Sequence, residues 1–139
     1  MAAIDNINTA QFVSRVRSTG GATVNLATGK LVNPGTKGYM VGGERDTKGA
    51  QIPSTIVPSG EFGEEHVAEA ATRIRGATGG RARTHLGAWE DSGKVYLDAA
   101  SVTKRPGEAI RKGRSRNEIS IWDNKRMREI KTGGTGESK

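Results

Sequence analysis

The residues of this chain best suited to recognition are cationic and aromatic side chains in its second half. Basic residues crowd around one predicted short helix and continue past Trp122. A guanidinium or ammonium group neutralises a phosphate, and an aromatic ring offers a flat face on which a base stacks. This pattern is typical of a nucleic-acid-binding or partner-binding surface. Its candidate members are Arg105, Arg111, Lys112, Arg114, Arg116 and Arg126, together with Trp89, Tyr96 and Trp122.

The alternation of residue types along two predicted strands indicates how the aromatic rings are used. In residues 94–98 the aliphatic side chains lie on one face and Tyr96 on the other, and in residues 118–123 Trp122 opposes two isoleucines. We expect helices to cover the aliphatic face. The aromatic face is then open to a ligand, or is covered by the N-terminal segment or by a partner. We favour a protein partner over a nucleic acid, and buried tryptophans with solvated cations remain the structural alternative.

Residues suited to catalysis or metal binding do not follow a recognised pattern. The chain has no cysteine, which excludes a disulfide, a thiolate metal site and a cysteine nucleophile. His66 and His85 have no ligand partner at a metal spacing, and neither a nucleophile elbow nor a phosphate-binding loop occurs. Glu90, Asp91 and Asp98 flank a predicted turn, where acids usually cap or solvate the backbone. We therefore expect no enzyme activity, metal or cofactor, and rank a hydrolase or transferase using His85 and Glu90 last.

The charge of the chain is concentrated near its C-terminus. The formal net charge is +7, to which residues 1–100 contribute 11 basic and 10 acidic side chains and residues 101–139 contribute 11 and 5. Hydrophobic residues make up only 33%, and 20 residues are glycine, so part of the chain is expected to be loop or tail. Neither a signal peptide nor an apolar run long enough for a membrane span is apparent, and we expect no membrane partner.

The elements that position these residues predict an α+β protein. Helices are expected over 4–18, 61–75 and 108–116, and strands over 22–26, 38–43, 52–57, 84–90, 94–98, 118–123 and 127–131. From residue 38 this order predicts a small antiparallel or mixed sheet with two helices on one face, a split βαβ of ferredoxin-like order. The predicted organisation is an N-terminal helix and extended arm at 1–37, a compact domain at 38–131 and a flexible Gly-rich tail at 132–139.

Two predicted ends of elements depend on residues that tolerate a positive φ. Gly93, after Asp91 and Ser92, is suited to a tight hairpin turn between two of the strands. Asn117 is suited to end the basic helix in the left-handed conformation. Both residues are expected to serve the scaffold.

Several segments of the chain resemble small proteins of actinobacterial phages and related mobile elements. The resemblance covers about residues 22–136 and no activity comes with it. It is carried by GYMV (38–41), LGAW (86–89), GKVYLD (93–98), EAI (108–110) with Gly113 and Arg114, NEISIWD (117–123) and EIKTGG (129–134).

The resemblance and the residue patterns together imply a phage accessory protein that acts through protein contacts. The leading hypothesis is a minor virion or capsid-associated component, found in the virion or the host cytoplasm. Its partner would be another phage structural protein or a host protein, and a second copy of the chain is a further candidate. The alternative hypothesis is a basic nucleic-acid-binding or host-directed phage protein.

Overall fold

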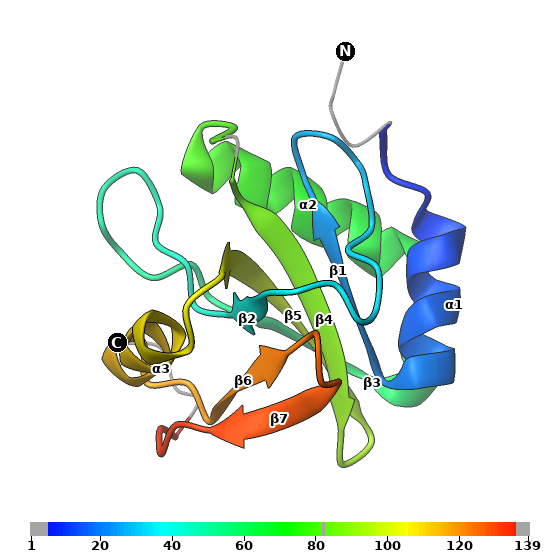
Figure 1. Ribbon diagram of the computed structural model, residues 1–139. Coiled ribbons are helices and arrows are strands. Elements are labelled where there is room, and N and C mark those ends of the chain that lie inside the picture. Colours follow the sequence, from blue (N-terminus) through cyan, green and yellow to red (C-terminus); the bar gives the residue numbers. More distant parts are fainter. Residues whose placement is uncertain (1–5, 82, 136–139) are drawn as a thin grey trace.

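The protein has an α+β fold in which three helices accompany a seven-stranded antiparallel sheet (Figure 1). The computed structural model describes residues 6–81 and 83–135, and this count refers to them. The helices are α1 (Thr9–Thr19), α2 (Glu64–Thr78) and α3 (Pro106–Ser115), with a short 3-10 turn at Ser59–Glu61. The strands are β1 (Gly21–Asn25), β2 (Tyr39–Val41), β3 (Thr55–Pro58), β4 (His85–Asp91), β5 (Lys94–Thr103), β6 (Ser120–Asp123) and β7 (Arg128–Lys131).

The strand order is β1-β4-β5-β2-β6-β7, with β3 also paired to β5, so the expected ferredoxin-like order is wrong. The reason is the length of β5, which continues to Thr103 instead of ending at Asp98. One edge of this long strand pairs with β3 near its start and with β2 near its end, while its other edge pairs with β4. The strand β1 then occupies the free edge of β4.

The N-terminal segment belongs to the folded body, which corrects the expectation of an extended arm. Asn8 caps α1 by accepting a hydrogen bond from the Gln11 backbone N–H at 3.0 Å. Phe12 and Val16 on α1 are fully buried in the main core, and β1 extends the sheet beside β4. This segment was mistaken for an arm because its turn-rich residues after β1 resemble a linker. Its apolar residues are nevertheless needed to cover the sheet.

The C-terminal segment is partly bound to the sheet. Thr132 donates its backbone N–H to Ile119 O and Gly134 donates to Glu118 O, both at 3.0 Å. Of the tail expected at 132–139, residues 132–135 are therefore held beside the start of β6, and residues 136–139 lie outside the described part.

All three helices pack on one face of the sheet. α1 and α2 cover Val95 and Leu97 of β5, and α3 covers a smaller cluster that includes Val41 and Ile121. The register places Val41 opposite Ser101, which shares a β5 face with Val95 and Leu97. The opposite face is left without helices, as the alternation predicted. No helix among residues 6–81 and 83–135 is both long and apolar enough to cross a membrane.

Candidate binding site on the concave sheet face

The sheet face without helices carries two rows of side chains that the strand register places side by side. In the first row, Ile56 on β3 lies opposite Tyr96 on β5, and Tyr96 lies opposite Trp89 on β4. The Trp89 and Tyr96 rings stack with centroids 4.6 Å apart and planes 17° apart. Cross-strand aromatic pairs of this kind stabilise a sheet. The two rings therefore form one continuous apolar surface.

The second row crosses the other half of the sheet. Met40 on β2 lies opposite Val102 on β5 and opposite Trp122 on β6. Trp122 in turn lies opposite Glu129 on β7. The Trp122 indole Nε1 donates a hydrogen bond to Asn124 Oδ1 at 3.3 Å, which orients the ring. The ring stays accessible, because Trp122 is 36% exposed.

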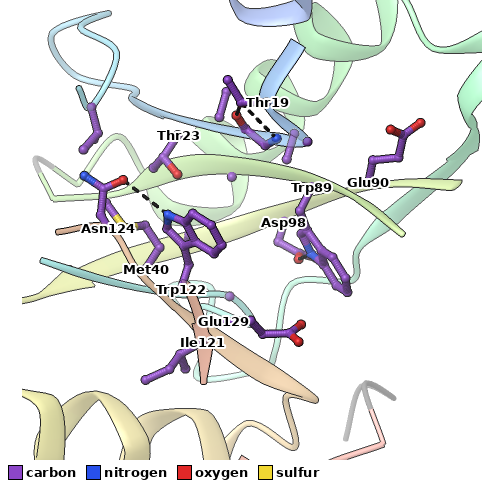
Figure 2. A pocket seen from close by; sticks show the side chains of 18 of the residues that line it. Thr19, Thr23, Met40, Trp89, Glu90, Asp98, Ile121, Trp122, Asn124 and Glu129 are labelled. Atoms are coloured by element: carbon purple, nitrogen blue, oxygen red, sulfur yellow. Dashed lines mark hydrogen bonds between the residues drawn. The ribbon is translucent and has the colours of Figure 1, made fainter. Parts of the chain in front are cut away.

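The two rows border a cavity of about 320 Å³. Residues from β1 and from β7, which are at opposite ends of the sheet order, both line it, so the sheet curls around it. Gly42, Gly87 and Ala100 leave much of its floor without long side chains. Figure 2 shows Trp122 and Trp89 in the same hollow, one coming from β6 and the other from β4. A concave, aromatic-lined space of this kind is the usual form of a ligand or side-chain pocket.

Asp98 supplies a buried carboxylate to this cavity. It lies on the same β5 face as Tyr96 and is only 9% exposed. Its Oδ1 accepts a hydrogen bond from the Ser54 hydroxyl, and its Oδ2 accepts one from Trp89 Nε1 at 3.3 Å. Burial raises the pKa of Asp98, and the two hydrogen bonds and the charge of Arg73 oppose that rise. Asp98 therefore ties the Trp89 ring to the cavity.

Glu118 brings a second carboxylate close to Asp98. An ideal Cβ at Gly42 would lie 2.5 Å from Glu118 Oε1 and 3.2 Å from Asp98 Oδ2, so both carboxylates approach this glycine. Burial, and then the charge of Asp98, raise the pKa of Glu118 from 4.5 to about 7, while the charge of Arg116 opposes the rise. The close approach of two carboxylates thus depends on a glycine at residue 42.

The cavity is strongly acidic although the chain is basic. Its lining contains five carboxylates and one cation, Arg15. The Arg15 guanidinium donates a hydrogen bond to Val32 O at 3.3 Å, which holds it near the edge of β1. The five acids are Glu90, Asp91, Asp98, Glu118 and Glu129. A third of the 15 acidic side chains of the chain are therefore gathered at this one surface.

Arg116, a candidate phosphate ligand from its sequence neighbourhood, is buried in the structure. Its guanidinium donates hydrogen bonds to Val41 O at 3.3 Å, Gly42 O at 3.1 Å and Ser101 Oγ at 3.0 Å. It also pairs with Glu44 at 3.2 Å. Only 8% of Arg116 is exposed, so this side chain is committed to the scaffold and fixes the backbone beside Gly42.

The other candidate cations do not lie with the aromatic rings. Arg105, Arg111 and Arg114 are exposed on or next to α3, which packs against the opposite sheet face. Lys112 contacts Glu108 on the same helix at 3.7 Å, and Arg126 pairs with Asp123 at 3.3 Å after β6. The structure thus brings Trp89, Tyr96 and Trp122 to one face and separates them from the basic residues of α3.

The residues proposed for a hydrolase do not converge. Glu90 lines the cavity, but His85 is not among its lining residues, and His85 Nδ1 lies 2.9 Å from Arg83 O. Burial lowers the pKa of His85. The described residues also contain no group of three or more His, Asp or Glu side chains arranged to hold a metal ion.

Sequence reasoning missed the pairing of Asp98 with Glu118. The strand alternation does place Asp98 on the face of Tyr96, so half of this pair was accessible from the sequence. No sequence signal locates Glu118, because its position depends on how the segment after α3 meets the loop after β2.

Comparisons of the chain with protein-family models, with curated proteins and with solved structures found no match. The proposals below therefore depend on the geometry and charge of the cavity.

Proposed function

We propose that this chain is an accessory protein of a phage or related mobile element that works by binding a partner protein on its concave sheet face. The observation that supports this most is the cavity itself, where two tryptophans and five carboxylates are gathered on a sheet face that no helix covers. Tryptophan is strongly enriched among the residues that dominate binding energy at protein interfaces. The resemblance to phage proteins supplies the biological setting, a virion or capsid-associated role.

The exposed apolar side chains favour the same face. Ile56, Trp122 and Met127 are 54%, 36% and 43% exposed, and they are three of the four large hydrophobic residues exposed in the described part of the chain. Trp122 and Met127 line the cavity, and Ile56 belongs to its first row. Apolar side chains that cluster on one surface mark an interaction site more often than scattered ones do.

Site-specific photo-crosslinking in phage-producing cells tests this proposal. A benzophenone amino acid replaces Met127 at the cavity, and Ile119, which is 37% exposed and does not line the cavity, is the matched control. We expect a discrete crosslinked partner from the Met127 position only. Mass spectrometry of purified particles then shows whether that partner and this chain are particle components. Crosslinks of equal yield from both positions, or none from Met127, would contradict the proposal.

A second candidate function is nucleic-acid binding by α3. The observation in its favour is the exposure of Arg105, Arg111 and Arg114 together on this helix and its N-terminal flank. If α3 binds phosphates, affinity for a single-stranded oligonucleotide falls steeply with salt, and replacing Arg111 and Arg114 with alanine makes that slope shallower. Binding that does not respond to salt would reject this function.

A further inference from the structure

The charge of the cavity opposes the charge of the molecule around it. The chain carries 22 basic and 15 acidic side chains, yet the cavity lining has five acids and only Arg15 as a base. A net positive protein attracts anions in general. An acidic hollow within it instead selects a positively charged group, because its carboxylates lie closest to whatever enters.

The aromatic walls favour the same kind of group. The face of a tryptophan ring carries negative electrostatic potential and attracts an ammonium or guanidinium group within about 6 Å of its centre. Trp89 and Trp122 both line the cavity, and Asp98 accepts a hydrogen bond from the Trp89 indole. A cation entering here would meet ring faces and carboxylates together. Neither feature suits a phosphate, which the five carboxylates repel.

The size of the cavity limits the occupant. Its volume of about 320 Å³ is at the low end of the roughly 300–1,000 Å³ usual for ligand pockets. It therefore accommodates one long side chain and not a folded element. Long apolar stems with a charged tip belong to lysine and arginine, and such a stem packs well on Met40 and the indole rings.

We infer that the concave cavity is a receptor for a single lysine or arginine side chain of the partner protein, with the charged tip placed near Asp98 and Glu118. This inference rests on the proposed function and adds the chemistry of the partner to it. A bare metal ion fits less well, because no set of three or more His or carboxylate ligands comes together within residues 6–81 and 83–135.

Intrinsic fluorescence tests the inference directly, because the two tryptophans of the chain both line the cavity. The probe is tetralysine, and the matched control is the same peptide with every lysine acetylated, which removes the charge and keeps the stem. We expect tetralysine to change the emission in a saturable way and to bind at least ten times more tightly than the acetylated peptide. Equal effects of the two peptides, or no effect of tetralysine, would overturn the inference.

Three variants connect the signal to the cavity. Glu118→Gln is expected to weaken tetralysine binding, and Trp122→Leu to weaken it roughly 3- to 10-fold through the lost ring face. Glu108→Gln on α3 removes one acid outside the cavity and is expected to leave binding unchanged. Circular dichroism confirms that each variant is folded. Equal losses in Glu118→Gln and Glu108→Gln would overturn the inference, since they would indicate a general charge effect.

The two proposals fail in different ways. If tetralysine does not bind but the Met127 position still crosslinks a partner, the concave face is an interaction surface and the inference about lysine or arginine is wrong. If tetralysine binds and crosslinks come only from α3, the cavity recognises cations but the proposed function is wrong.

Discussion

Replacing Glu118 with glutamine is expected to remove most of a pH dependence from the stability of the protein. In the unfolded chain Glu118 ionises near its ordinary pKa of 4.5, whereas in the folded protein burial and Asp98 raise this pKa to about 7. Between these values the folded state retains a proton that the unfolded state has released. Stability contributed at this site therefore falls as pH rises through that window and stays low above it.

The size of this effect follows from the shift. A rise of the pKa from 4.5 to about 7 corresponds to at most about 3 kcal/mol, because one pKa unit is worth about 1.4 kcal/mol. Glu118 is partly exposed, so solvent screening reduces the expected penalty to roughly 1–2 kcal/mol. A glutamine side chain has the same shape as glutamate and cannot ionise. We expect Glu118→Gln to be more stable than the natural chain at pH 8 by this amount, with a smaller difference at pH 5.

Urea unfolding at pH 5 and pH 8, followed by tryptophan fluorescence, measures this difference. Asp98 and His85 also have shifted pKa values, but both proteins contain them, so their contributions largely cancel in the comparison. Asp98→Asn is a poor alternative because Asp98 also accepts the Trp89 hydrogen bond. If the two proteins show the same stability difference between pH 5 and pH 8, Glu118 is not held beside Asp98 and the account of the cavity floor is wrong.

Three further substitutions test the scaffold. Phe12→Ala is expected to destabilise the fold by about 3–5 kcal/mol, since Phe12 is fully buried in the main core; a loss below about 1 kcal/mol in thermal or urea unfolding would restore the idea of a loose N-terminal arm. Arg116→Ala is expected to cost about 3–5 kcal/mol, because it leaves Glu44 without its buried partner, and the double variant Arg116→Ala, Glu44→Ala should recover part of this loss. Gly134→Ala should detach the C-terminal segment, because a Cβ there would lie 2.4 Å from the Asn117 backbone; unchanged hydrogen-exchange protection of the residue 134 amide would contradict this.

The local elements were predictable where short-range chemistry decides them. The hairpin between β4 and β5 is confirmed, with Ser92 at φ 52° and Gly93 at φ 80° in the turn. Asn117 follows α3 at φ 56°, as its tolerance of the left-handed region predicted. The alternation in β5 also placed Tyr96 correctly on the face opposite Leu97. Each of these depends on residues close together in sequence.

The arrangement of the sheet was not predictable from the same patterns. The order of strands depends on β5 pairing with β3 and β2 along one edge, and nothing local to Thr103 indicates that this strand is so long. The convergence of Asp98 with Glu118 at Gly42 joins three segments far apart in the chain. Arg116 was grouped with exposed cations because its sequence neighbours are basic, whereas its burial depends on contacts with β2 and with Glu44.

The most direct test of the central claim is a map of amide and indole N–H chemical shifts while ¹⁵N-labelled protein is titrated with tetralysine. We expect the largest changes at the Trp89 and Trp122 indole N–H groups and at the Gly42 and Gly87 amides, all of which belong to cavity-lining residues. The amides of α3 should change little. Changes concentrated on α3, or none at either indole, would contradict the assignment of the concave face as the binding surface.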